Sequence, residues 1–136
     1  MVRKINSGAI QLLPVHGIGE VSQGDDIGKI IVQTCSRSRL KLQNNDILVV
    51  THKIVSKAEG RVYELDTFSP SKFAIKVGRH IGKDPRQVEA ILSESRRLVK
   101  VVKGLIISEN SLGFVCANAG VDQSNVTKGS VELRPN

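Results

Sequence analysis

Asp122 and Asn125 are the residues of this sequence whose types and spacing best fit ligand chemistry. They follow the segment 113–121, Gly-Phe-Val-Cys-Ala-Asn-Ala-Gly-Val, in which a short apolar run gives way to small residues. Small residues let a backbone approach a ligand closely, and an aspartate among them can bind a hard divalent cation. The same pattern also predicts a hairpin followed by an Asx turn, in which the Asp122 carboxylate accepts a hydrogen bond from its own backbone. The residues alone leave both interpretations open.

Two other segments carry groups that could hold phosphate. Residues 16–20, His-Gly-Ile-Gly-Glu, follow a predicted strand, and their two glycines indicate a turn, although the full dinucleotide fingerprint is absent. His52, Lys53 and Lys57 follow the apolar run 47–50, at the end of a predicted buried strand where α/β proteins commonly place sites. For each of them alone, a solvated loop residue is the commoner interpretation. Cations for phosphates together with a carboxylate for a divalent ion would suit phosphoryl transfer.

Composition and motifs limit the protein class. The chain has 136 residues, 40% apolar and 24% charged, which favours one globular domain over residues 1–136. We expect a cytoplasmic protein, because no apolar run approaches the roughly 20 residues of a membrane span and residues 1–7 lack a signal-peptide pattern. Cys35 and Cys116 lie in apolar runs and are expected to be buried free thiols. P-loop, nucleophile-elbow and zinc spacings are all absent.

The order of predicted elements favours an α/β (α+β) fold with a mixed sheet. A helix is predicted after Asp25 and Asp26, with apolar residues at helical spacing. Ser69-Pro70 and Asp84-Pro85 each indicate a helix start and Gly82 a stop between them, so this segment predicts an αα-hairpin. Strands are predicted at 9–15, 47–50 with an extension through 54–55, 61–65, 98–102, 105–108 and 114–117. No strong element is predicted after residue 126.

The net charge of +7 indicates an anionic partner. The predicted helix pair and the residues after it carry Lys76, Arg79, Lys83, Arg86, Arg96 and Arg97. This basic set could bind nucleic acid, but no aromatic residues are interleaved with it. A solvated helix face is the commoner structure, so a nucleic-acid partner is the least favoured interpretation.

Taken in order, the motifs resemble those of one family. The blocks are Gly17-Ile-Gly-Glu-Val, Gly24-Asp-Asp, Ile54-Val-Ser-Lys-Ala-Glu-Gly-Arg, Gly82-Lys-Asp-Pro-Arg with Glu94-Ser-Arg, and Gly113-Phe-Val-Cys-Ala-Asn-Ala-Gly-Val-Asp-Gln-Ser-Asn-Val. Their order and spacing look like the N-terminal portion of the coenzyme F420-0:L-glutamate ligases, the γ-glutamyl ligases of deazaflavin coenzyme biosynthesis. Two stretches within these blocks are highly specific: Val55-Ser-Lys-Ala-Glu-Gly-Arg and Cys116-Ala-Asn-Ala-Gly-Val-Asp-Gln-Ser-Asn.

The resemblance implies a GTP- and divalent-metal-dependent ligase with an unusual mixed α/β fold that forms homodimers. Such an enzyme adds L-glutamate through its α-amine to the terminal carboxylate of the coenzyme F420 precursor, through an acyl phosphate, and builds a γ-linked tail. The resemblance implies Mg²⁺ or Mn²⁺ at Asp122 and a monovalent cation such as K⁺. It assigns no catalytic residue. The implied nucleotide-binding residues are Ile18, Gly19, Glu20, Val21, His52, Lys53, Lys57 and Asn125.

Two departures from the family pattern stand out. His52-Lys53 occupies a position where many relatives carry small hydroxyl residues. Family members also run to roughly twice this length, and further metal and nucleotide ligands lie in the part beyond. The sequence is therefore expected to be an N-terminal fragment, a truncated product or a divergent half-protein. The alternative to an active ligase is a non-catalytic or half-site member that needs a partner chain.

Overall fold

The computed structural model describes residues 10–124 and 128–135. It has a mixed α/β fold, as the sequence predicted, and among the described residues no helix is long and apolar enough to cross a membrane. The helices are α1 (Ile27–Arg37), α2 (His52–Ala58), α3 (Lys72–Ile81) and α4 (Pro85–Ser93), with 3-10 turns at Leu65–Thr67 and Asn118–Gly120. The strands are β1 (Val62–Glu64), β2 (Ser95–Val102), β3 (Leu105–Asn110), β4 (Val115–Ala117) and β5 (Ser130–Glu132).

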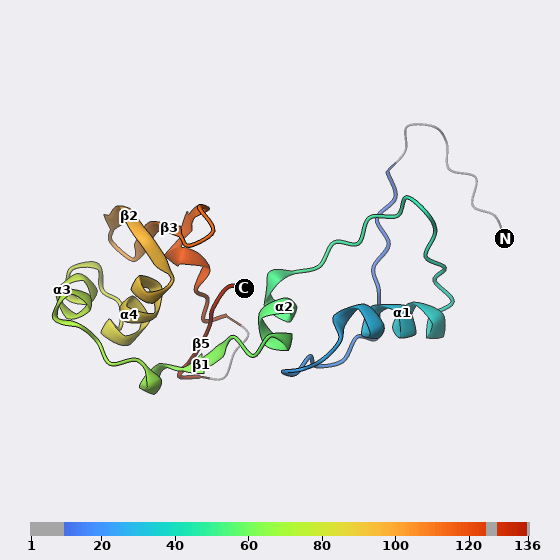
Figure 1. Cartoon of the computed structure of the whole chain (residues 1–136), viewed down its shortest axis with the longest axis horizontal. Helices are drawn as coiled ribbons and strands as arrows, with labels where there is room; N and C mark the ends of the chain where they lie inside the picture. Colours follow the sequence, from blue (N-terminus) through green and yellow to red (C-terminus); the bar gives the residue numbers. More distant parts are fainter. Residues whose placement is uncertain (1–9, 125–127, 136) are drawn as a thin grey trace.

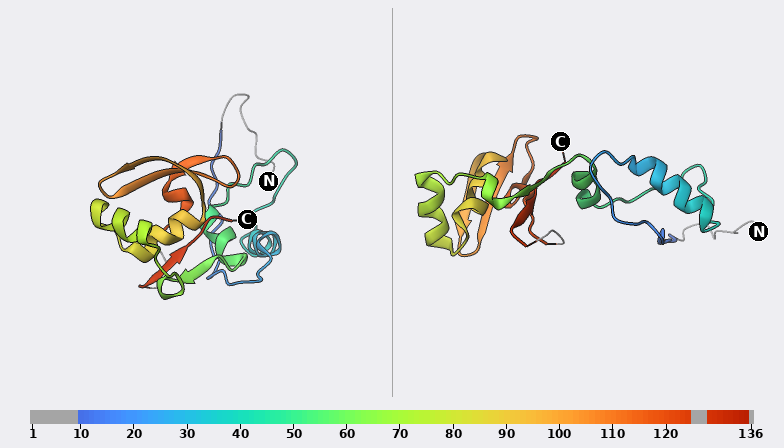
Figure 2. Two further views of the ribbon diagram at one scale, coloured as in Figure 1. Left: turned by 60° about the vertical axis from the view of Figure 1, so that its left-hand side comes forward. Right: turned by 90° about the horizontal axis from the view of Figure 1, so that it is seen from below.

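The described strands form two small antiparallel sheets, where the sequence predicted a single mixed sheet. β2, β3 and β4 form one sheet in that order, and β1 pairs with β5 in the other. Figure 1 shows α1 set apart from the β2–β3–β4 sheet, with α2 between them, and the right-hand view of Figure 2 shows the same arrangement from below. α2 therefore connects the first third of the chain to the rest.

The predicted αα-hairpin is confirmed, and its local signals explain where it starts and stops. The Ser71 hydroxyl accepts a hydrogen bond from the Ala74 N–H, so α3 begins two residues later than Ser69-Pro70 predicted. Gly82 ends α3 in the left-handed region at φ 74°, and Asp84 caps α4 with Pro85 in its first turn. The hairpin packs on the sheet through a core of Ala74, Ile81, Val88, Ile91, Ile106, Val121 and Val131, all 5% exposed or less.

Two predicted strands are wrong in the described structure. Residues 10–15 and 47–50 have no regular secondary structure, and Ile10 and Val49 are 92% and 89% exposed. A strand needs a partner for its backbone groups, and the described part of the chain pairs none with these two segments. Their apolar side chains remain uncovered.

The predicted strand extension at Ile54 and Val55 is also wrong, because these residues lie in α2. Gly60 follows the last turn of this helix with φ 70°, the left-handed conformation that often terminates helices. One further element was missed: β5 forms where no strong element was expected after residue 126.

Candidate functional site

Lys53 and Lys57 lie on one face of α2, because side chains four residues apart in a helix are neighbours. Both side chains are 23% exposed. His52 is exposed at the start of the helix. The basic residues that the sequence placed after a strand are therefore held by a helix, with the two lysines one turn apart.

Lys57 contacts the loop that contains the predicted glycine turn. Its Nζ lies 2.5 Å from the Glu20 carboxylate, which is 79% exposed. Val21 is buried, and the Gly24 N–H donates to the Ala58 carbonyl at 2.8 Å, so the end of this loop is fixed to the end of α2. The loop and the lysine, 37 residues apart in sequence, thus form one surface.

Lys53 contacts the second predicted segment. Its Nζ lies 2.6 Å from Asp122 Oδ2 and also donates to the Ser124 hydroxyl. The Ser124 N–H donates to Asp122 Oδ1 at 2.9 Å, and the Ser124 hydroxyl donates to Oδ2 at 2.7 Å. The Asx turn is therefore present. It leaves the carboxylate 33% exposed beside a lysine ammonium.

The surroundings of Asp122 favour its ionised form. Partial burial would raise the pKa of Asp122, but the hydrogen bonds from Lys53 and Ser124 and the charge of Lys53 hold it well below its usual range. Asp122 is thus a permanent anion at neutral pH, which is the form that a cation requires.

Glu132 is a site residue that the sequence reasoning missed. It is 0% exposed, and neither carboxylate oxygen has a hydrogen-bond partner among the described residues. Burial raises the pKa of Glu132, while His52, Lys53 and Lys57 oppose that shift. Its only sequence signal was its place between two apolar residues, Val131 and Leu133, where a charge would be costly to bury.

The oxygen donors here fit a divalent cation of the kind that the family resemblance implies. Among residues 10–124 and 128–135, no three His, Cys, Asp or Glu side chains form a metal cluster. Mg²⁺ is usually bound by only one or two carboxylates, with water and substrate phosphates as its other ligands. Asp122 and the unpartnered Glu132 supply such a pair, and Lys53 and Lys57 beside them would attract the phosphates.

The remaining predicted nucleotide-binding residues have no described hydrogen bond or ion pair with Lys53 or Lys57. Gly19 is exposed in the same loop as Glu20, and Ile18 is half-buried. Ile18 lines a cavity of about 780 Å³ bounded mainly by apolar side chains of 11–15, 40–42 and 46–51. Asn125 lies outside the described residues.

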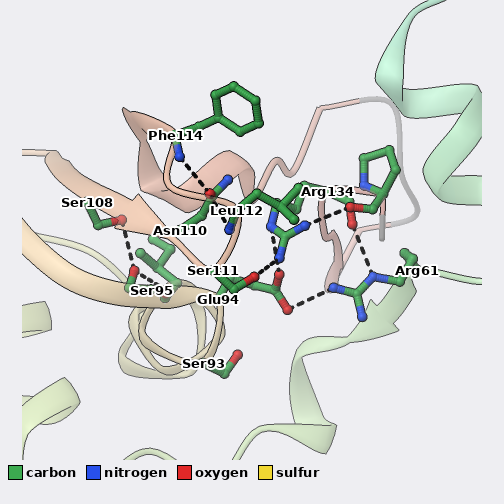
Figure 3. Close-up of polar contacts among 12 residues, drawn as sticks. Arg61, Ser93, Glu94, Ser95, Ser108, Asn110, Ser111, Leu112, Phe114 and Arg134 are labelled. Carbon is green, nitrogen blue, oxygen red and sulfur yellow. Dashed lines mark hydrogen bonds and ion pairs between the residues drawn. The ribbon is translucent and has the colours of Figure 1, made fainter.

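A buried ionic cluster supports the strand that carries Glu132. Glu94, at the end of α4, accepts from Arg61 Nη2 at 2.8 Å and lies 3.4 Å from Arg134 Nε, and all three side chains are 17% exposed or less. Arg61 Nε also donates to the Arg134 carbonyl at 3.1 Å (Figure 3). The cluster therefore ties the start of β1, through Arg61, and the chain after β5, through Arg134, to the end of α4.

The basic residues proposed for nucleic acid are partly neutralised. Arg86 pairs with Asp84 at 2.6 Å and also with Asp66. Arg97 pairs with Glu109 at 2.7 Å, and Arg96 lies 3.7 Å from the same residue. Half of that set thus has an acidic partner already, which weakens the case for a nucleic-acid surface.

Comparison with known proteins shows that the chain is similar to a family of ligases. A model of the F420-0:gamma-glutamyl ligase family matches residues 17–136. The chain belongs to this F420-0:gamma-glutamyl ligase family, as its motifs predicted.

Curated relatives share most of this chain. Proteins named coenzyme F420:L-glutamate ligase are 44% identical over 120 residues in Methanothermobacter thermautotrophicus and 41% identical over 126 residues in Methanopyrus kandleri. These alignments cover 88% and 93% of this chain but 48% of each relative. In Methanocaldococcus jannaschii a relative of the same name is 48% identical over 88 residues, 65% of this chain and 35% of the relative. The chain thus spans about half the length of the relatives it matches.

Proposed function

We propose that this chain is the nucleotide-binding part of a GTP-dependent ligase that adds L-glutamate to the terminal carboxylate of a coenzyme F420 precursor. One observation carries the proposal: α2 contacts the Glu20 loop through Lys57 and the Asp122 turn through Lys53. Segments far apart in sequence thereby converge as a nucleotide site requires. The names of the relatives support coenzyme F420 and L-glutamate as substrates, and the proposal of GTP comes from the motif resemblance alone.

The proposed reaction has two steps. A carboxylate oxygen of the precursor attacks the γ-phosphorus of GTP, GDP leaves, and an acyl phosphate forms. The α-amine of L-glutamate then attacks the acyl carbon, phosphate leaves, and the amine gives up a proton as the amide bond forms. Both steps move negative charge on phosphate oxygens, so positioned cations are the main catalytic requirement.

The chain's own residues have separate roles in this scheme. Lys57, beside the Glu20 loop, would hold the phosphate oxygens, and the glycines of the loop would admit the phosphates close to the backbone. Asp122, kept ionised by Lys53 and Ser124, would hold Mg²⁺ or Mn²⁺, which supplies charge neutralisation when it is bound.

A second candidate is a half-site that functions only with additional polypeptide. The segments 10–15 and 47–50 are rich in Ile, Leu and Val, and Ile10, Leu12, Ile47 and Val49 are each at least 87% exposed. Monomeric proteins rarely leave contiguous apolar surface of this kind uncovered. Because the relatives are twice as long, we propose that a segment equivalent to their second half covers this surface, whether in a longer form of the chain, in a separate chain or across a homodimer.

A ligation assay separates these candidates. The 136-residue chain is incubated with coenzyme F420-0, L-glutamate, GTP, Mn²⁺ and K⁺, alone and with the separately produced second half of the Methanothermobacter relative. Glutamylated product and GDP from the chain alone support the complete ligase, and product only from the mixture supports the half-site. Failure of both, with Methanothermobacter full-length protein active as the control, contradicts both candidates.

A further inference from the structure

Glu132 lacks the partners that a buried carboxylate normally has. It is 0% exposed, and both of its oxygens are without a hydrogen-bond partner in the described structure. Burying an ionised carboxylate without compensation costs several kcal/mol, so such a group in a native fold calls for an explanation. The adjacent surface already contains Lys53, Lys57 and Asp122, which points to a ligand at this position.

Strand register places the carboxylates of Asp122 and Glu132 together. The two residues form an antiparallel bridge in which Asp122 N donates to Glu132 O at 2.9 Å and Glu132 N donates to Asp122 O at 2.8 Å. Residues that exchange both hydrogen bonds lie with Cα atoms about 5.5 Å apart and with side chains on the same face. The two side chains therefore leave the backbone opposite each other on one face, and in addition to burial the Asp122 charge contributes to raising the pKa of Glu132.

Two like charges in this arrangement destabilise the pair unless a cation lies beside them. In the described structure that cation is the Lys53 ammonium, 2.6 Å from Asp122 Oδ2. It satisfies Asp122 but makes no hydrogen bond to Glu132, whose oxygens stay unpartnered. A divalent cation has a higher charge and more coordination positions than an ammonium group. It could therefore contact both carboxylates at once, whereas Lys53 contacts only that of Asp122.

We propose that Asp122 and Glu132 together bind a divalent cation, and that Lys53 acts as an internal counter-ion that the cation displaces. Two carboxylates leave room in an octahedral shell for water and for phosphate oxygens. The displaced ammonium is then free to donate to those phosphates. The inference rests on the proposed function, which assigns the divalent cation to Asp122, and deepens it by adding Glu132 as a second ligand and Lys53 as the counter-ion that the cation displaces.

The proposal predicts that substitutions of the two carboxylates and of Lys53 change the Mn²⁺ affinity in opposite directions. The affinity is measured without nucleotide, from the electron paramagnetic resonance signal of free Mn²⁺. Glu132→Gln and Asp122→Asn each remove a direct ligand and should weaken binding by about tenfold or more, at least as much as losing an outer-shell partner does. Lys53→Met removes the competing charge and should strengthen binding several-fold. Glu109→Gln, at a carboxylate paired with Arg97 on the β2–β3 sheet, is the matched control and should bind as the unaltered chain does.

Two results would overturn the inference: unchanged Mn²⁺ affinity in Glu132→Gln, or weaker affinity in Lys53→Met. Circular dichroism of each variant checks that it is folded. The tighter Mn²⁺ binding expected of Lys53→Met could not result from misfolding. A parallel titration with GTP distinguishes this inference from the proposed function. Mn²⁺ binding that depends on Glu132 without any GTP binding contradicts only the function, whereas GTP binding with no effect of Glu132→Gln on Mn²⁺ contradicts only the inference.

Discussion

Lys53 and Lys57 are one helical turn apart on α2 but pair with acids from opposite ends of the chain, Asp122 and Glu20 respectively. A seven-residue helix thereby joins the loop before α1 to the turn after β4. Neither pairing is local, so this convergence is a property of the fold. It also supports the proposal of a nucleotide site at α2 over one at the apolar cavity that Ile18 lines, whose walls offer few charges.

Replacing Gly78 with alanine should destabilise the protein, although alanine normally favours a helix over glycine by about 1 kcal/mol. A Cβ at Gly78 would lie 2.8 Å from the Lys83 carbonyl oxygen, in the α3–α4 connection, and 3.3 Å from Pro85 Cα, at the start of α4. We expect a loss of about 1–3 kcal/mol in urea unfolding. Gly28→Ala in α1 is the control: its Cβ meets nothing closer than 3.4 Å, so this change should be neutral or stabilising. A stable Gly78→Ala variant would contradict the packing described between α3 and α4.

Replacing Glu94 with alanine should cost about 3 kcal/mol, because it leaves Arg61 and Arg134 charged and largely buried without their shared partner. Tyr63, the single tyrosine in a chain without tryptophan, lies in β1 and reports unfolding of this region by its fluorescence. Arg96→Ala, whose side chain is 73% exposed, should change stability by less than about 0.5 kcal/mol. Equal losses from the two variants would show that the cluster has no special role.

Stability should also depend on pH through Asp84. The side-chain hydrogen bond from Arg86 lowers the pKa of Asp84 below its unfolded value, although desolvation opposes the shift. A lowered folded pKa means that the ionised Asp84 stabilises the fold above about pH 4 and loses this contribution as pH falls through the folded pKa. Because the Arg86 and Asp84 side chains are 40% and 35% exposed, solvent screens the pair and the effect should stay under about 1 kcal/mol.

Asp84→Asn keeps a side-chain oxygen for the α4 cap and removes only the charge. The variant should therefore be less stable than the unaltered chain at pH 7 and approach it at pH 3 in thermal unfolding. A stability difference that grows as pH falls would contradict the assignment to this ion pair.

Local signals explain what could be predicted from the sequence. The caps at Asp26 and Asp84, the stop at Gly82 and the Asx turn at Asp122 each depend on contacts within four residues, and all four are present. The family motifs then related Asp122 to Lys57 and the glycine turn, although no spacing rule does so.

Long-range pairing explains what could not be predicted. The run 47–50 has a strand composition, but the described chain offers it no neighbouring strand. Glu132 gained its importance only from its register with Asp122, ten residues earlier, and from the approach of α2. α2 was not predicted, because the β-branched residues Ile54 and Val55 favour a strand.

The most direct test of the central claim is a calorimetric titration of the 136-residue chain with GTP in the presence and absence of Mg²⁺ or Mn²⁺. The proposal predicts binding that requires the divalent ion and that weakens by about tenfold or more in Lys57→Ala and in Asp122→Ala, since each removes a charge-assisted contact. GTP affinity that is the same in both variants and in the unaltered chain would contradict the site.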